Sequence, residues 1–192
     1  AVEIADIIKL YSKYARRVTP ELLEANTYSF NYNEWDTVLK EWNDLERRAL
    51  RVYQKLDQRW YDAFEQLVLF PIQAMQNMYE MYYSVAMNEK AASPVEINYW
   101  AKRVEDLYKR DSLLCAHYHH DISGGKWNHM MDQIHIGYTY WQQPDKQVMP
   151  KIKKVKEEIY LCHKEADGYI SIEAGNFKSN RGATVLPDLG KT

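Results

Sequence analysis

Apolar residues recur at intervals of three and four positions through most of the first 120 residues. This interval places the apolar side chains on one side of an α-helix, so it predicts a series of amphipathic helices. We expect the first helix to end before Thr19-Pro20 and Asn33 to cap the start of the second. The repeating positions are Ile4, Ile7, Ile8 and Tyr11 in the first helix, and Trp35, Val38, Leu39, Trp42, Leu45, Ala49, Val52 and Leu56 in the second.

A third helix is predicted to begin near Asp57 and to keep the same period as far as Ala86. Pro71 lies inside it, and we expect a kink there because proline lacks a backbone N–H and clashes with the preceding turn. The apolar positions of this helix are Trp60, Phe64, Leu67, Val68, Ile72, Met75, Met78, Tyr79, Tyr82, Val85 and Ala86.

A fourth helix is predicted to begin at Ser93. Ser93 and Glu96 have the spacing of a capping box, and Pro94 occupies the first helical position, where proline is favoured. The apolar positions are Ile97, Trp100, Ala101, Val104, Leu107, Tyr108 and Leu114, and the helix is expected to end near Tyr118, before Gly124-Gly125. The predicted fold is therefore mainly α, an antiparallel bundle of four to five long helices.

The pattern changes after Pro150. The sequence "DGYISIEAGNF", which begins at Asp167, alternates apolar and polar residues and predicts β-strands. We expect residues 1–158 to form the helical bundle, and residues 159–192 to form a linker and the first strands of a truncated β domain. Since the chain begins in helical rhythm and stops soon after the change of pattern, we expect it to be part of a longer protein.

Composition narrows the function classes. The 192 residues are 46% apolar and 27% charged, which is typical of a folded domain, and no apolar run is long enough to span a bilayer. The net charge of −2 is spread along the chain, which argues against nucleic-acid binding. The 16 Tyr and 6 Trp are unusual: they fit an interface or a sugar-binding surface, although we expect most of them to fill the core.

Two histidine-rich segments are candidates for chemistry. In "HYHHD", His117, His120 and Asp121 have spacings that could bind a metal, but the chain lacks the Glu-x-x-His pairs of dinuclear bundle sites, and we expect no metal or other cofactor. In "HMMDQIH", Asp132 and His135 would touch on a helix, and a hydrogen-bonded His, Asp and Gln network is favoured over a catalytic dyad. Cys115 is expected to be a small core residue.

Three segments together resemble the helical region of glycoside hydrolase family 115. They are "TYSFNYNEWDTVLKEWNDL", "FEQLVLFPIQAMQNMYEMY" and "ISGGKWNHMMDQIHIGYTYWQQP", and the terminal "DGYISIEAGNF…LPDLGKT" is similar to the opening of that family's C-terminal β-sandwich. The family consists of large xylan α-1,2-glucuronidases that release glucuronic acid, or its 4-O-methyl form, with inversion. The resemblance implies that the catalytic acid and base belong to a TIM-like barrel outside this chain, so no catalytic residue is expected here and the chain alone should be inactive.

The resemblance also implies a role for the aromatic segment Gly124–Pro144. We expect it to dock on the barrel of the same parent protein, which acts on glucuronoxylan, with the rim of the substrate pocket within its reach. The candidate contact residues are Trp127, His129, Met130, Gln133, His135, Tyr138, Tyr140 and Trp141. Without the barrel, this face is expected to be partly exposed or to pair with a second copy of the chain. Family habit implies a periplasmic or secreted protein.

Two alternatives stay open at the level of sequence. The chain could be a stand-alone carbohydrate-binding or protein-interaction module without an enzymatic parent. It could also be a metal-dependent bundle enzyme built on His117, His120 and Asp121.

Overall fold

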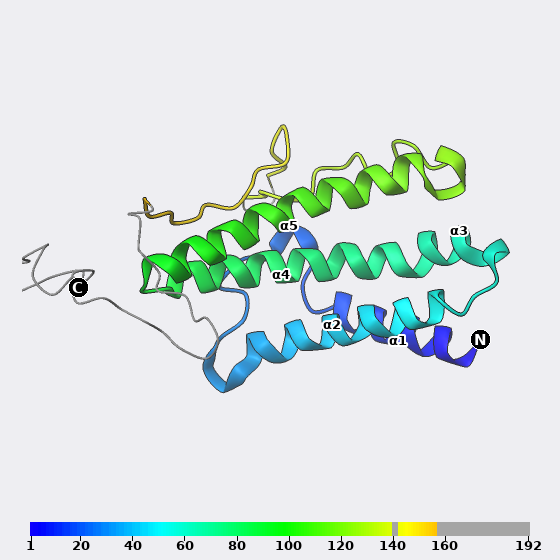
Figure 1. Cartoon of the computed structure of the whole chain (residues 1–192), viewed down its shortest axis with the longest axis horizontal. Helices are drawn as coiled ribbons and strands as arrows, with labels where there is room; N and C mark the ends of the chain where they lie inside the picture. The colour runs from blue at the N-terminus through cyan, green and yellow to red at the C-terminus, as the bar shows by residue number, and fades with distance from the viewer. Residues whose placement is uncertain (140–141, 157–192) are drawn as a thin grey trace, which may run out of the picture. The chain divides into compact units, whose positions relative to one another are not determined.

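The computed structural model describes residues 1–139 and 142–156, of which residues 1–155 form one compact helical unit. The long helices are α1 (Val2–Ala15), α2 (Glu34–Tyr53), α4 (Phe70–Lys90) and α5 (Pro94–His120), and each runs antiparallel to the next (Figure 1). Helix α4 lies between α2 and α5, and α1 packs against α2. The predicted mainly α, antiparallel bundle is therefore confirmed. The predicted boundary after residue 158 and the predicted β segment lie outside the described residues.

The starts of α5 and α2 show how local sequence sets the helix ends. At α5 the Ser93 hydroxyl accepts a hydrogen bond from the Glu96 N–H at 3.2 Å, and the Glu96 carboxylate accepts from the Ser93 N–H at 3.3 Å, which confirms the capping box. At α2 the prediction is only partly right. Asn33 occupies the cap position, but its φ of +57° is left-handed and its side chain makes no capping bond. Instead, the Ser29 N–H donates to the Glu34 carboxylate at 2.8 Å, so Glu34 ties the preceding turn to the helix.

The predicted third helix is a composite. It begins with a 3₁₀ turn (Gln58–Trp60), continues through α3 (Tyr61–Phe64) and a π-helical turn (Glu65–Leu69), and then becomes α4. The π turn ends just before Pro71, and the Phe70 N–H donates to the Glu65 carbonyl. A π turn is one way for a helix to accommodate an interruption of its hydrogen-bond ladder, here the missing proline N–H. The wider turn also shifts the phase of the apolar face, so Leu67, expected to be inward, is 69% exposed, whereas Val68 and Leu69 are buried.

Aromatic side chains form much of the core, as the composition predicts. Trp42 of α2 contacts Tyr14 of α1 and Tyr79 of α4, with ring centroids 5.6 Å and 5.3 Å apart, and Trp35 and Tyr28 extend the same cluster. Trp35, Trp42 and Tyr79 are completely buried. A large aromatic side chain buries about 150–250 Å², so this cluster is a major source of stability for the unit.

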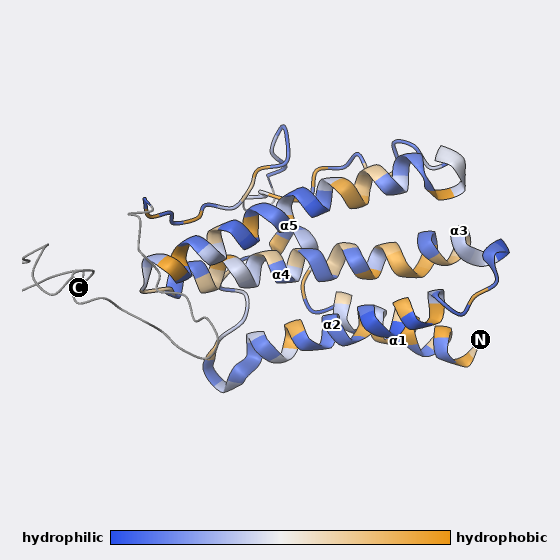
Figure 2. Cartoon of the chain, viewed as in Figure 1, coloured by the Kyte–Doolittle hydropathy of each residue, from blue (hydrophilic) through white to orange (hydrophobic). Residues whose placement is uncertain are grey.

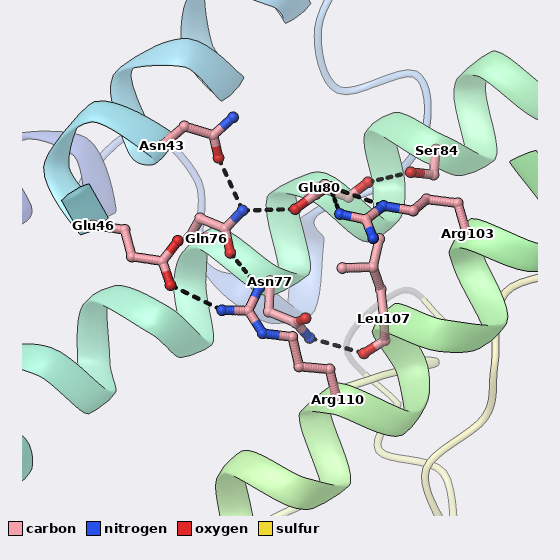
Figure 3. A network of polar contacts seen from close by, with 9 residues as sticks. All are labelled: Asn43, Glu46, Gln76, Asn77, Glu80, Ser84, Arg103, Leu107 and Arg110. Carbon is pink, nitrogen blue, oxygen red and sulfur yellow. Dashed lines mark hydrogen bonds and ion pairs between the residues drawn. The ribbon is translucent and has the colours of Figure 1, made fainter. Parts of the chain in front are cut away.

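Helix α4 also carries buried polar residues that link it to both neighbours (Figure 3). Gln76 is central: its amide nitrogen donates to Asn43 of α2 at 2.9 Å, and its amide oxygen accepts from Arg110 of α5 at 2.8 Å. Arg110 also donates to Glu46 of α2 at 2.8 Å, so α5 and α2 are joined across α4. One turn along, Glu80 of α4 accepts from Arg103 of α5. This network pairs polar groups that would be costly to bury alone, and it fixes the lateral register of the three helices.

After α5 the chain returns in irregular form, and residues 147–155, here called the strap, lie along α4 and α5. Two asparagine side chains hold the strap by bonding both backbone groups of one residue. Asn88 of α4 accepts from the Lys153 N–H at 2.7 Å and donates to the Lys153 carbonyl at 3.0 Å. Asn98 of α5 does the same for Val155, at 3.0 Å and 2.9 Å. The two held residues are two positions apart, as expected for an extended chain that presents alternate residues to one side.

Hydrophilic and hydrophobic residues alternate along the helices (Figure 2), as an amphipathic bundle requires. None of the helices in the described part of the chain is both long enough and apolar enough to cross a membrane.

Candidate functional site

The histidine-rich segment begins with a tight reversal of the chain. A 3₁₀ turn (Ile122–Gly125) follows α5, and Ser123, Gly124 and Gly125 all have positive φ values, of 53°, 62° and 81°. Two adjacent glycines allow this left-handed path at little cost. Residues 126–139 then run back beside α5 in turns rather than as a helix. A contact between Asp132 and His135 on one helical face, considered from the sequence, therefore does not form.

Trp127 packs onto the end of its own bundle. It lies with Met131 against a small apolar cluster made of Phe70 of α4, Tyr118 of α5 and Ile122. The Trp127 indole nitrogen is buried and has no hydrogen-bond partner among the described residues. Trp127 thus anchors the returning segment to α4 and α5.

A second anchor comes from His119 of α5, whose Nε2 accepts a hydrogen bond from the Met131 N–H at 3.0 Å. Nearby, the His129 Nδ1 lies 2.7 Å from the Asp132 carboxylate. The His129 side chain is 77% exposed, so this pair stands on the surface. Between the two anchors, Met130 projects outward and is 61% exposed. The loop backbone is held in place while its apolar tip is left uncovered.

His135 connects the returning segment to the middle of α5. Its Nε2 lies 3.0 Å from each oxygen of the Asp111 carboxylate, which is buried. Burial of the ring opposes its charged form, but the hydrogen bond to Asp111 and the charge of that carboxylate outweigh this, so the pKa of His135 is raised. Asp111, one turn beyond Leu107 on α5, is the partner of His135 that the sequence did not indicate.

The strap fixes the backbone around His135. The Gln147 side-chain oxygen accepts from the His135 N–H at 3.1 Å and from the Ile136 N–H at 2.7 Å, and the Val148 N–H donates to the Ile136 carbonyl at 3.1 Å. Gly137 permits this approach, because its φ is +93° and an added Cβ would lie 2.6 Å from the Val148 Cβ. Of the network predicted within "HMMDQIH", the His129–Asp132 contact forms, whereas His135 bonds outside that segment, to Asp111 and Gln147.

These elements enclose a pocket of about 230 Å³ between α4, α5, the returning segment and the 3₁₀ turn Pro20–Leu22. Its walls are mostly apolar and unusually rich in methionine, with Asp111, Cys115 and His135 grouped at one side. The lining residues are Pro20, Glu21, Phe70, Ala74, Met75, Met78, Asp111, Leu114, Cys115, Met130, Met131, Gln133 and His135. The volume lies slightly below the roughly 300–1,000 Å³ of drug-sized ligand sites, so the pocket fits a small group or an inserted side chain.

The Asp111, Cys115 and His135 group does not form a nucleophilic site. Burial, with the Asp111 and Asp132 charges as smaller contributions, raises the pKa of the Cys115 thiol to about 12, so the thiol keeps its proton. The imidazole Nε2 faces Asp111, and Nδ1 lies 3.0 Å from the Gln133 carbonyl, so neither ring nitrogen is positioned as the base of Cys115. One ligand atom from each of the three residues does, however, lie within 4.8 Å of the others, so the group is close enough together to hold a metal ion.

The other histidine cluster is arranged differently from a metal site. His117 places Nδ1 2.8 Å from Asp121 and Nε2 3.0 Å from Glu65 of the π turn. Burial opposes protonation, but the two carboxylates prevail and raise the pKa of His117. His117 thus joins α5 to the π turn through Glu65, whereas its contact with Asp121 lies within the end of α5, and His120 takes no part in either contact.

The eight candidate contact residues fall into groups. Trp127 and His135 contact their own fold. Met130 and Gln133 are exposed and line the pocket, His129 is exposed next to Met130 in the chain, and Tyr138 is half-buried. Tyr140 and Trp141 lie outside the described residues.

Sequence reasoning did not identify the pocket wall that faces the returning segment. This wall is formed by residues of α4 and α5, which are distant in sequence from residues 126–139: Met75, Met78, Asp111 and Cys115. The sequence did contain one indication of this wall: Asp111 and Cys115 are four positions apart, which places both side chains on the same face of a helix.

The chain was compared with known families and proteins. No family model matches it, and no curated protein shows significant similarity to it.

Proposed function

We propose that this chain is the non-catalytic helical module of a xylan α-1,2-glucuronidase and that it docks on the catalytic barrel of that enzyme. The proposal starts from the three helical segments and the terminal segment that resemble glycoside hydrolase family 115. The observation that carries the docking role is Met130, an apolar side chain 61% exposed at the tip of a loop whose backbone is fixed. A rigid loop with an uncovered apolar tip and polar neighbours has the character of an interface.

The docking surface in this proposal consists of His129, Met130 and Gln133, beside the mouth of the pocket. Met130 would lie at its centre, with the polar His129 and Gln133 side chains at its rim. Such a contact costs little ordering entropy, because the Met131 and His135 N–H groups already donate to the His119 and Gln147 side chains, and Trp127 packs on the bundle before Met130. A flexible loop with the same residues would bind its partner more weakly.

A supporting role, rather than a catalytic one, fits the chemistry of the pocket. An inverting glycosidase needs an acid and a base about 6.5–9.5 Å apart, each available to the substrate. Both oxygens of Asp111 lie 3.0 Å from the His135 Nε2, so this carboxyl group is paired with an imidazole instead of standing free as a catalytic acid or base. The proposal therefore assigns the acid and base to the barrel.

The test uses the chain together with the barrel of a xylan α-1,2-glucuronidase and measures two quantities, binding between them and release of glucuronic acid from glucuronoxylan. Met130→Asp should weaken binding by roughly tenfold or more, since it places a charge in the centre of an apolar contact. Val95→Asp is the matched control, because Val95 is also 61% exposed but lies at the opposite end of α5. It should leave binding unchanged.

The outcomes separate the hypotheses. Equal binding by both variants, or no binding between the chain and the barrel, would refute docking through this loop. Binding of glucuronic-acid-substituted xylo-oligosaccharides by the chain alone would favour a stand-alone carbohydrate-binding module instead.

A further inference from the structure

We infer that Asp111, Cys115 and His135 form a site for a borderline divalent cation of the Zn²⁺ type, with the methionine-lined pocket as its open side. Carboxylate, thiolate and imidazole are the side chains that bind Zn²⁺, and three protein ligands with one open position are typical of accessible zinc sites. This inference goes beyond the proposed function and does not depend on it.

The backbone presents the three donors from two rigid supports. Asp111 and Cys115 are four positions apart on α5, so both side chains lie on the same face of one long helix. His135 approaches this face from the returning segment, and the three donor atoms already lie within 4.8 Å of one another. A tetrahedral zinc site separates its donor atoms by about 3.3–3.6 Å, given zinc–ligand distances of 2.0–2.3 Å. Reducing the donor separations by at most about 1.5 Å would therefore complete the geometry.

The surroundings of His135 also match those of a metal ligand. A histidine that binds a metal through one ring nitrogen usually donates the other N–H to a carbonyl or carboxylate. Here Nε2 faces Asp111, and Nδ1 lies 3.0 Å from the Gln133 carbonyl, which can accept its proton. The Gln147 amide nitrogen lies 3.0 Å from the same Nδ1, so a form without the Nδ1 proton also has a partner. Either tautomer of the ring is therefore held in place.

A second layer of contacts supports the ligands. Gln147 binds the backbone N–H groups of His135 and Ile136, and its own carbonyl accepts from the Tyr108 hydroxyl of α5 at 2.9 Å. The loop that carries His135 is thereby tied to the helix that carries the other two ligands. A preformed site of this kind loses less entropy on binding a cation than a flexible one.

Charge and polarity favour a cation of charge +2. Asp111 is buried and supplies one negative charge, and Cys115 supplies a second when the metal displaces its thiol proton. Starting from the thiol and the imidazolium, binding replaces the thiol proton and the Nε2 proton by one Zn²⁺; the two protons pass to solvent, and the neutral ring keeps its remaining proton on Nδ1, facing the Gln133 carbonyl. The bound site is then neutral overall, which suits a pocket whose other walls are mostly apolar.

The open coordination position would face the pocket, because all three ligand residues line it. Water or a small donor such as a carboxylate could occupy that position within the 230 Å³ available. The cation would also connect α5 to the segment that carries His135, and so add to the contacts that already hold this segment.

The experiment uses the full 192-residue chain, freed of metal with a chelator and kept reduced. Zn²⁺ and Mg²⁺ are titrated separately by calorimetry, and Co²⁺ is used as a spectroscopic probe of thiolate and tetrahedral coordination. We expect one Zn²⁺ per chain, no comparable Mg²⁺ binding, and a near-ultraviolet thiolate-to-cobalt band. Zinc should also raise the melting temperature, because the three ligands are brought together only in the folded chain.

Variants test the three ligands. Cys115→Ser should remove the thiolate band, and both Cys115→Ser and His135→Gln should weaken zinc binding at least tenfold. His117→Gln and His129→Gln are the matched controls, since each of these histidines also pairs with carboxylates but lies outside the group. Circular dichroism checks that every variant folds.

Two results would overturn the site. The first is zinc binding no tighter than that of magnesium in the unaltered chain. The second is zinc affinity unchanged in Cys115→Ser, or lost only in the His117 or His129 variant, which would place the ion elsewhere. If a variant does not fold, the cobalt spectrum of the unaltered chain decides instead. Absence of the thiolate band from that spectrum counts against the site.

Discussion

The attachment of the strap to the bundle depends on one buried side chain, Asn88. It is completely buried, its oxygen accepts from the Lys153 N–H at 2.7 Å, and its nitrogen donates to the Lys153 and Ile97 carbonyls at 3.0 Å and 2.8 Å. Asn88→Ala removes all three hydrogen bonds and leaves the groups of Lys153 without their partners. We expect the strap to detach locally and the free energy of unfolding to fall.

The magnitude follows from the contacts. Each hydrogen bond contributes about 0.5–1.5 kcal/mol net, so three bonds give about 1.5–4.5 kcal/mol. The Ile97 carbonyl lies in the first turn of α5 and keeps its helical partner, and a detached Lys153 can bond to water, so the upper end overstates the cost. We expect a loss of about 2–3 kcal/mol, including part of the contacts that Met149 and Ile152 make with the core.

Urea denaturation measures this loss, and amide hydrogen exchange shows whether it is local. The Lys153 and Val155 amides should exchange much faster in Asn88→Ala, whereas amides in the middle of α4 should change little. Asn98→Ala is the control, because Asn98 makes the same pair of bonds to Val155 but is only half-buried. It should lose about 1 kcal/mol. Equal losses in the two variants, or unchanged protection of Lys153, would refute the view that the buried clamp holds the strap.

Three further variants test the backbone and the core. Gly137→Ala should lower the free energy of unfolding by about 2–4 kcal/mol, because it adds a Cβ 2.6 Å from that of Val148 at a φ of +93°. Gly124→Ala should lower it by only about 1–2 kcal/mol, because Gly124 has a φ of +62° but no atom within 4 Å of the added Cβ. Thermal unfolding of the two variants makes the comparison. Burial and the hydrogen bond to Asp36 raise the pKa of Tyr83 from 10.0 to about 12. The folded state therefore binds this proton more tightly, and the associated stability is present below pH 10 and lost as the pH rises towards 12. Tyr83→Phe should reduce this alkaline loss, measured as the free energy of unfolding against pH; an identical pH profile in the variant would contradict the assignment.

The helices could be predicted from the sequence because their determinants are local. The period of the apolar residues, the Ser93 and Glu96 capping box and the glycine pair after α5 all act over a few neighbouring positions, and all appear in the structure as expected. The aromatic core followed from composition in the same way, since residues such as Trp42 recur on the apolar stripe. A mainly α bundle was thus specified by the sequence alone.

The candidate site depended on contacts that no local pattern encodes. The residues after Gly125 were compatible with a helix, but the packing of Trp127 and the hydrogen bonds to His119 and Gln147 hold them in an irregular return path. His135 therefore meets Asp111 instead of Asp132.

Local sequence thus determined where the helices begin and end, since capping and periodicity act within a turn or two of the chain. The tertiary structure alone decided which side chains share the pocket, because Asp111, Cys115 and His135 come together only after the chain has reversed and been held against α5 by the strap. The π turn before Pro71 is a similar case. Pro71 predicted an interruption of the helical hydrogen bonds from the sequence. That the interruption is a π turn, with Val68 and Leu69 in the core and Leu67 exposed, is seen only in the tertiary structure.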